Sequence, residues 1–554
     1  MPTATRVPVL AADSLRAHAS YARRLGAWLR SPHDLPASRE VVSAALVRRE
    51  AELLVTMRHG IYALERSPYL ALLRHAGIEL SDAETAVRDH GVEGALARLY
   101  DAGVRVTLDE LKGRTPIVRP GLELPVSSRD FDNPLIRRDL RLVGGGTRGP
   151  RRPVHIDLSL LARDAAHMRV FQDAAGLADL PIAAWRPSLP AGPGIYHALL
   201  HAKLGQPTER WFAQLPPYPP GGSVRSAGLL GITLAVAGAL GAGIPPPRHV
   251  PLERVVQVAR WLAGHVTAGR RPYLNTTASG AVRVCDAARA AGLGIAGTVF
   301  RVGGEPYTPA RARVLAEAGC VAYPFLQSNE VGRVGITCVE RHAPDEVHLL
   351  LDKLAVLRRD VQARTRRVEG ALVLTTLWSR TPKLLLNAES DDTAVVERGP
   401  CGCPLGALGL HTRLHTIRSW EKLTTEGMTF TAALTLRLVE EVLPQRFGGG
   451  PTDYQLVEDR SGPISQVLVL VSPRVGAVDG GAVREVALNV LAEGGTGTGF
   501  MAASWRAAGL PRVERREPYA TGRPKILPLH VIEPDAGGSG YFDGLRPPSR
   551  TKSA

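Results

Sequence analysis

The chain has few cysteines and few aromatic residues for its 554 positions. Its five cysteines, at positions 285, 320, 338, 401 and 403, do not have the pattern of a secreted disulfide framework. The N-terminal segment has no basic stretch followed by a long apolar core, so we expect no signal peptide. These absences favour a cytoplasmic protein.

Long apolar runs and long basic runs are also missing. One uncharged stretch, at residues 226–245, is nearly long enough to cross a bilayer, but it is dominated by Gly and Ala and ends at a run of prolines. We therefore expect a buried helix there and no membrane partner. The formal net charge is +15, yet the basic residues are dispersed, which argues against a nucleic-acid partner.

The length of the chain predicts more than one domain. Apolar residues spaced three and four apart predict a helical N-terminal region over residues 1–110. Helices and short apolar strands then alternate, which predicts a large α/β domain over residues 111–416. A smaller α+β domain is expected at residues 417–540, followed by a disordered tail at 541–554.

A glycine-rich loop follows one predicted strand near the start of the α/β region. Its residues are Gly144, Gly145, Gly146, Thr147, Arg148 and Gly149. Successive glycines let backbone N–H groups approach phosphate oxygens, while a hydroxyl and a guanidinium add further contacts. The loop lacks the Gly-Lys-Ser/Thr of a Walker motif. Taken alone, it predicts a phosphate site or an ordinary flexible turn about equally.

Two further segments follow in the α/β region, Gly304-Glu305-Pro306 and Leu326-Gln327-Ser328-Asn329-Glu330. With the glycine loop, they resemble the ordered motifs of the adenylate-forming superfamily of acyl-CoA synthetases and adenylation domains. The branch that contains phenylacetate–CoA ligase and the acyl-protein synthetases is the most similar. By this resemblance the loop holds the ATP phosphates, the Gly-Glu-Pro turn borders the adenine, and Glu330 holds Mg²⁺. The residue before it, Asn329, touches the α-phosphate.

Three positions nearer the C-terminus extend the resemblance. Asp392 stands where the family has the aspartate that grips both ribose hydroxyls. Arg418 resembles the arginine of the hinge between the large and small domains, which contacts ribose or phosphate. Lys525 resembles the lysine that bridges the carboxylate and the α-phosphate. The resemblance thus implies a small mobile C-terminal domain, with Lys525, Arg418 and Glu330 as catalytic residues.

The resemblance implies an ATP- and Mg²⁺-dependent ligase that activates a small carboxylic acid as acyl-AMP and releases pyrophosphate. The acyl group would then pass to a thiol, of coenzyme A (CoA) or of a carrier protein. Two alternatives stay open: an amine or protein acceptor, and a catalytically degenerate homologue that only binds nucleotide. The second stays open because of departures from the family pattern: Leu326 replaces the stacking tyrosine and Asn329 the usual threonine, which weakens the inferred ATP contacts.

A cysteine pair follows the ribose-binding candidate. Cys401 and Cys403 are separated by one glycine, and two thiolates at this spacing can share a metal ion. Cys338 follows the Glu330 segment, with His342 four residues later. If the two loops meet, these four residues predict a tetrahedral Cys₃His site for a structural zinc ion. Reduced thiols on an ordinary turn are the alternative.

In the family, the acid-binding pocket is lined by residues between the glycine loop and the Glu330 segment. Aromatic side chains there would favour a flat acid, although each is equally expected in the core. The candidates are Trp185, Tyr196, Trp211, Phe212, Tyr273 and Phe325.

Overall fold

The protein is described from a computed structural model. The described residues are 6–143, 153–189, 191–214, 216–217, 224–363, 366–419, 423–425, 428–430, 432–459, 466–493, 502, 505–506, 509–520 and 526–532.

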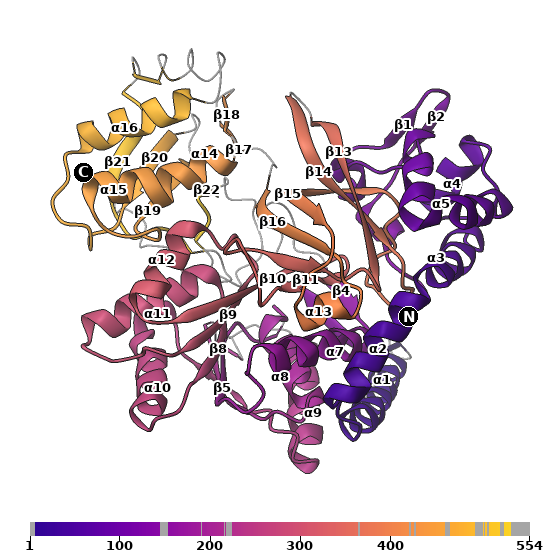
Figure 1. The fold of residues 1–554 in the computed structure, drawn as a ribbon, viewed down its shortest axis with the longest axis horizontal. Helices are drawn as coiled ribbons and strands as arrows, with labels where there is room; N and C mark the ends of the chain where they lie inside the picture. The colour runs from indigo at the N-terminus through magenta and orange to yellow at the C-terminus, as the bar shows by residue number, and fades with distance from the viewer. Residues whose placement is uncertain are drawn as a thin grey trace.

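A mixed sheet of twelve strands forms the centre of the molecule, in the order β13-β14-β15-β16-β12-β11-β10-β9-β8-β5-β6-β7 (Figure 1). The strands from β10 to β7 pair in parallel, whereas those from β10 through β11 to β13 pair antiparallel. The strands are β5 (Ile182–Trp185), β6 (Thr208–Ala213), β7 (Pro247–His249), β8 (Tyr273–Thr276), β9 (Val299–Gly303), β10 (Val321–Ser328), β11 (Gly332–Thr337), β12 (Val347–Leu349), β13 (Leu354–Ala363), β14 (Arg366–Thr376), β15 (Ala388–Arg398) and β16 (Thr412–Ser419).

Helices cover the parallel half of this sheet. Every residue of β5, β8 and β9 is buried, as expected of parallel strands with helices on both faces. The side chains of Asp157, Thr277 and Thr308 each cap a helix by accepting a backbone N–H from its first turn. The helices are α7 (Leu158–Ala174), α8 (Pro193–Lys203), α9 (Val224–Ala239), η3 (Leu252–Arg254), α10 (Val256–Thr267), α11 (Ala278–Ala290) and α12 (Pro309–Glu317).

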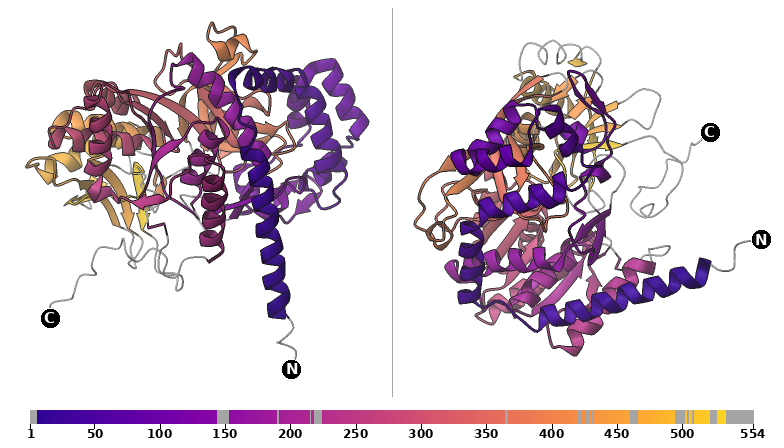
Figure 2. Two further views of the ribbon diagram at one scale, coloured as in Figure 1. Left: turned by 90° about the horizontal axis from the view of Figure 1, so that it is seen from below. Right: turned by 90° about the vertical axis from the view of Figure 1, so that its right-hand side faces the viewer.

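The N-terminal part is helical, and it packs against two different parts of the main sheet. The long helix α1 contacts α8 and α9, and its first turns extend away from the body (Figure 2). The elements from α3 to α6 share a hydrophobic core with the antiparallel strands, and this core includes Leu53, Leu96 and Leu372. These elements are α1 (Arg6–Leu29), α2 (Leu35–Val47), α3 (Arg49–Met57), η1 (Arg58–Tyr62), α4 (Pro68–His75), α5 (Leu80–Asp101) and α6 (Leu108–Leu111).

The C-terminal part forms a second, smaller sheet in the order β21-β20-β19-β22, with a core of its own that includes Leu438, Tyr454 and Leu488. The strand β22 was not expected from the sequence; it pairs in parallel with β19. The elements are α14 (Ala432–Arg437), η4 (Leu438–Val442), α15 (Leu443–Phe447), β19 (Tyr454–Asp459), β20 (Gln466–Val471), α16 (Gly480–Ala492), β21 (Arg512–Arg515) and β22 (Leu529–Ile532).

Short elements complete the fold. They are the strand pairs β1 (Ile117–Arg119) with β2 (Leu122–Leu124), β3 (Leu140–Val143) with β4 (Pro153–Ile156), and β17 (Leu423–Thr425) with β18 (Met428–Phe430), the 3₁₀ turn η2 (Ser128–Phe131), and α13 (Pro404–Ala407). The large mixed sheet and the small C-terminal sheet confirm the α/β fold class expected from the sequence. Of the helices described, none combines the length and apolar character needed to cross a membrane.

Candidate functional site

A cavity of about 2770 Å³ lies where the carboxyl ends of the parallel strands meet the N-terminal helices and the C-terminal part. Asn275 lines it from the end of β8, Gly303 from the end of β9 and Ser328 from the end of β10. Leu527 lines it from the C-terminal part. Ligands of open α/β sheets bind in this position, beyond the carboxyl ends of the strands.

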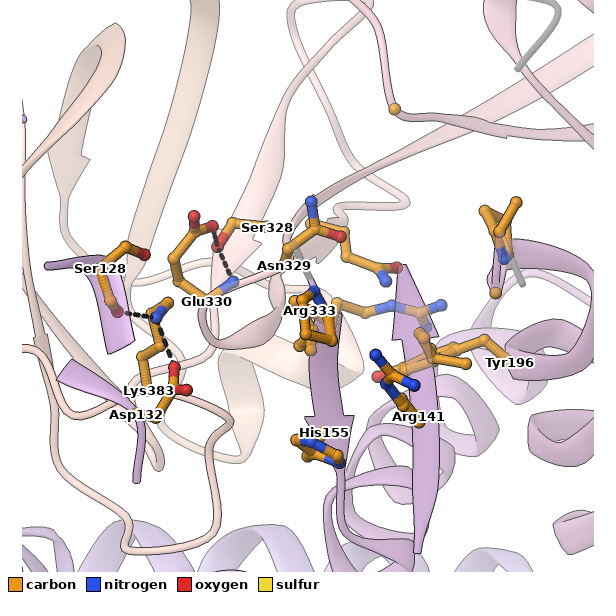
Figure 3. A pocket seen from close by; sticks show the side chains of 18 of the residues that line it. Ser128, Asp132, Arg141, His155, Tyr196, Ser328, Asn329, Glu330, Arg333 and Lys383 are labelled. Carbon is orange, nitrogen blue, oxygen red and sulfur yellow. Dashed lines mark hydrogen bonds and ion pairs between the residues drawn. The ribbon is translucent and has the colours of Figure 1, made fainter. Parts of the chain in front are cut away.

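With the exception of Arg418, the described residues that the sequence assigned to nucleotide binding line this one cavity. They come from three separate segments, at residues 304–306, 328–330 and 392, and Figure 3 shows part of this lining. Gly304 has a φ of +88°, which favours glycine at this turn. The residues are Gly304, Glu305, Pro306, Ser328, Asn329, Glu330 and Asp392.

Glu330 is held by a cation that the sequence did not suggest. Its Oε1 accepts a hydrogen bond from Lys112 Nζ at 2.6 Å, and its Oε2 accepts one from Ser328 Oγ at 3.0 Å. Burial raises the pKa of Glu330, but the Lys112 ammonium outweighs this effect and leaves the pKa below its ordinary value. The carboxylate is therefore ionised and suited to binding a cation.

Asp392 lies near Glu330 in the same part of the cavity. Burial raises the pKa of Asp392 to about 8, and the neighbouring carboxylates of Asp391 and Glu330 add to the effect. All three carboxyl groups line the cavity. A cluster of carboxyl groups at one place can accept the hydroxyl groups of a ligand or, where the groups are ionised, hold a metal cation.

Arg418 differs from the expectation of a direct ligand contact. Its guanidinium pairs with Asp345 at 2.9 Å, and Asp345 also accepts the backbone N–H groups of Thr416 and Ile417. Asp345 and Ile417 line the cavity, whereas Arg418 does not. In this arrangement Arg418 orients a cavity carboxylate instead of facing the cavity itself.

Glu305 connects the Gly-Glu-Pro turn to two helices. Its Oε1 accepts hydrogen bonds from the backbone N–H and the hydroxyl of Ser279, at 2.7 and 2.6 Å, in the first turn of α11. A carboxylate is favourable at a helix N-terminus. Its other oxygen lies 3.1 Å from Arg311 of α12. These contacts hold the Glu305 side chain in one position in the cavity lining.

Two predicted features, the glycine loop at 144–149 and Lys525, lie outside the described residues. The strands on either side of the loop, β3 and β4, contribute Arg141 and His155 to the cavity lining (Figure 3). Burial and the guanidinium groups of Arg138 and Arg141 lower the pKa of His155, so this edge of the cavity is electropositive.

Of the six aromatic residues proposed for the acid pocket, Tyr196 and Phe325 line the cavity. The other four are core residues and are almost fully buried. They are Trp185, Trp211, Phe212 and Tyr273.

A second candidate site holds three cysteines and one histidine, whose ligand atoms all lie within 4.8 Å of one another. Cys338 Sγ is 3.6 Å from Cys401 Sγ, and Cys403 Sγ is 3.1 Å from His348 Nε2. The other ring nitrogen of His348 lies 2.7 Å from the carbonyl oxygen of Leu410, which orients the ring as in many zinc sites. The set fits Zn²⁺ in a closed tetrahedral site. None of these four ligand residues lines the large cavity.

The histidine of this cluster is His348 and not His342, so the sequence-based choice of His342 was wrong. In the β11–β12 pair, Ile336 lies opposite His348. Cys338 is two residues beyond Ile336 and shares its face of the sheet, which makes His348 its diagonal neighbour. His342 lies in the connection between the strands, where its backbone N–H donates to Glu346.

No protein-family model matches this sequence, and no curated protein matches it either. Among solved structures, the chain is similar to a 2-hydroxyisobutyryl-CoA ligase in complex with R3-HIB-AMP, with 17% identity, a TM-score of 0.45 and 89% of each chain covered. It is similar to ATP-bound MatB from Rhodopseudomonas palustris, with 11% identity, a TM-score of 0.36, and 66% of this chain and 62% of that chain covered. It is also similar to O-succinylbenzoate coenzyme A synthetase from Bacillus subtilis, with 8% identity, a TM-score of 0.32 and 63% of each chain covered.

Proposed function

We propose that this protein activates a carboxylic acid with ATP to give an acyl-adenylate, and then transfers the acyl group to a thiol. One observation carries the proposal. Three segments with the residue types of a nucleotide site, which lie between residues 304 and 392, line a single cavity at the carboxyl ends of the parallel strands.

The chemistry brings two anions together. A carboxylate oxygen of the acid attacks the α-phosphorus of ATP, the bond between the α- and β-phosphates breaks, and pyrophosphate leaves. Catalysis then depends on positioning and on positive charge around the phosphates. Arg141 and the glycine loop at 144–149 would bind phosphate oxygens, and Lys525 would bridge the acid and the α-phosphate.

Two carboxylates have separate tasks in this proposal. Glu330 would hold Mg²⁺, which supplies charge neutralisation for the phosphates when bound. Asp392 would accept hydrogen bonds from the ribose hydroxyls, and the Gly304–Pro306 turn would border the adenine. Asp345, fixed by Arg418, would complete the wall beside the nucleotide.

Adenylation is tested by ATP–pyrophosphate exchange that depends on an added carboxylic acid. We expect Glu330→Gln and Lys525→Ala each to reduce the exchange rate by about 100-fold or more. The control must be a charged residue outside any buried ion pair, which excludes Lys353 because its side chain pairs with buried Asp164. The exposed carboxylate of Glu123 offers a better one, and Glu123→Gln should leave the rate unchanged. Full exchange in Lys525→Ala would contradict the proposed role of the lysine.

The acyl acceptor is tested in a separate experiment. Without CoA, the enzyme should retain acyl-AMP, which is detected by mass spectrometry of the denatured complex. Addition of CoA or of a phosphopantetheine carrier protein should release AMP and form the thioester. Release of AMP by an amine or a protein nucleophile, and not by a thiol, would support the alternative acceptor.

A second candidate function is nucleotide binding without turnover, and the Lys112–Glu330 pair favours it. The ammonium occupies the carboxylate that Mg²⁺ would need. In an active enzyme, Lys112→Met should lower the Mg²⁺ concentration required for half-maximal exchange, whereas Lys112→Arg should resemble the wild type. A protein that binds ATP but shows no exchange at any Mg²⁺ concentration, in either variant, is a binding protein.

A further inference from the structure

Arg333 is a buried guanidinium that lines the cavity beside the nucleotide segments. It belongs to β11, three residues after Glu330, and its side chain is shown among the cavity-lining groups in Figure 3. The residue is 2% exposed. In the β10–β11 pair it lies opposite Gln327, next to the segment proposed to contact the α-phosphate.

The polar contacts of this guanidinium are few. Its Nη1 lies 3.5 Å from Met168 Sδ, its Nε has no hydrogen-bond partner, and it stacks 4.9 Å from the centre of the Phe325 ring. Within the part of the chain that the structure describes, no carboxylate is within ion-pairing distance of it. Buried charges are normally paired, because desolvation of an unpaired ion is costly.

The carboxylate of Asp164, which contacts the backbone of Arg333, is already neutralised by another cation. Asp164 accepts the backbone N–H of Arg333 at 3.2 Å, but its side chain pairs with Lys353 at 2.6 Å and also accepts the hydroxyl of Tyr196. Asp164 and Lys353 are both fully buried. Asp164 therefore does not neutralise the charge of the Arg333 guanidinium at this end of the cavity.

Two neighbouring side chains, of Arg301 and His197, also have buried nitrogen atoms without a hydrogen-bond partner. Arg301 stacks 5.0 Å from the same Phe325 ring, and its Nε and Nη2 have no hydrogen-bond partner. His197 lines the cavity with an Nε2 that has no partner. Burial lowers the pKa of His197 well below its ordinary value, and Arg333 and Arg301 contribute to this, so the ring is neutral and can donate a hydrogen bond.

We propose that Arg333, with His197 beside it, binds a second anionic group of the acid, so that the substrates of this protein are dicarboxylic acids. The inference rests on the proposed function, because it identifies the acid that the same site would activate. One carboxylate of the substrate would lie at the Glu330 end and be adenylated. The second would form the ion pair that the Arg333 guanidinium lacks.

The test compares acids that differ only in the second carboxylate. Succinate is paired with butanoate, adipate with hexanoate, and terephthalate with benzoate, in pyrophosphate exchange and in calorimetric binding without ATP. We expect the wild type to prefer at least one diacid over its partner by about 10- to 100-fold. Arg333→Met should reverse that preference, and Arg333→Lys should restore part of it.

A matched control is available on α7. Arg169 is a half-buried arginine that does not line the cavity, and Arg169→Met should keep the wild-type preference. Reversal of the preference is the decisive readout, because loss of folding would lower exchange with both acids of a pair equally.

The remaining outcomes separate this inference from the proposed function. Exchange that favours monocarboxylic acids, equally in wild type and Arg333→Met, would overturn the inference while adenylation stands. Binding of a diacid that needs Arg333, without any exchange, would support the subsite while adenylation fails. Weaker ATP binding by Arg333→Met, with no change in acid preference, would assign the guanidinium to the nucleotide and overturn the inference.

Discussion

The carboxylates of the cavity show how one residue's ionisation depends on its neighbours. Glu330 and Asp392 line the same space, yet their pKa values shift in opposite directions. Lys112 stabilises the charge of Glu330, whereas burial, Asp391 and Glu330 itself disfavour the charge of Asp392. One carboxylate is thus kept ionised by its lysine partner, and the other is held largely protonated near neutral pH.

The raised pKa of Asp392 makes stability depend on pH in a defined direction. An unfolded aspartate ionises near pH 4, whereas Asp392 in the folded chain ionises at about pH 8. Between these values the unfolded state binds fewer protons, so the contribution of Asp392 to stability falls as the pH rises. Asp392→Asn should remove this slope, with a smaller decline of Tm between pH 5 and pH 8 than in the wild type.

The measurement is a series of thermal unfolding curves at constant ionic strength, without nucleotide. At pH 8 the Asp392→Asn variant should be more stable than the wild type, because the cost of the buried negative charge is gone. Glu123→Gln, which changes an exposed carboxylate outside the cavity, serves as the control and should follow the wild-type curve. Parallel curves for Asp392→Asn and wild type would contradict the raised pKa.

At the scale of elements, the β11–β12 pair and the segment before α13 form a unit that four side chains join. Cys338 follows β11, His348 belongs to β12, and Cys401 and Cys403 precede α13. Cys338 and Cys403 lie in the same hydrophobic core as residues of α7. A metal ion bound here would link the β11–β12 pair of the main sheet to the segment that precedes α13.

This arrangement predicts about one Zn²⁺ per chain, measured by mass spectrometry of the purified protein. His348→Ala and Cys403→Ser should lose most of the zinc, and their Tm should fall by roughly 5 °C or more. His342→Ala is the matched control, because His342 lies in the connection that leads to β12 but is not part of the cluster. Equal zinc content in His348→Ala and His342→Ala would refute the assignment.

The cluster also illustrates what sequence can predict. The spacing of Cys401 and Cys403, and the presence of Cys338, identified three of its members. The fourth was missed because the distance between Cys338 and His348 is set by strand register, which does not appear as a short spacing in the sequence. His342 was the nearest histidine in sequence, but not in space.

The cavity residues likewise divide into those that the sequence could identify and those that it could not. The segments at Gly304–Pro306 and Ser328–Glu330 were recognised by their resemblance to the ordered motifs of a known family. In the structure both lie at the carboxyl ends of strands of the parallel sheet, which meet at one edge. Lys112 and Arg333 could not be recognised in this way. Lys112 follows α6, 218 residues before Glu330, and Arg333 is an ordinary arginine until its burial is known.

At the scale of the whole molecule, a buried charge network joins the C-terminal part to the body. Arg311 of α12 pairs with Glu440 of η4 at 2.8 Å and with Glu305 at 3.1 Å. The hydroxyl of Thr308 also donates to Glu440. Because Glu305 is part of the cavity wall, the position of the C-terminal part is coupled directly to the proposed adenine site. Figure 1 shows α12 directly beneath the C-terminal helices.

Glu440 is therefore expected to control how firmly the two parts are docked. Glu440→Ala removes one of the two carboxylates that pair with the buried guanidinium of Arg311, and with it the ion pair that joins the two parts. Amide hydrogen exchange should accelerate in α12 and in α14 through α15, but not in α7, which packs in a different core. Glu441→Ala, at the neighbouring and more accessible position, should leave these rates unchanged. If Glu440→Ala instead accelerated exchange equally in α7, the network would stabilise the whole fold and not the contact between its two parts.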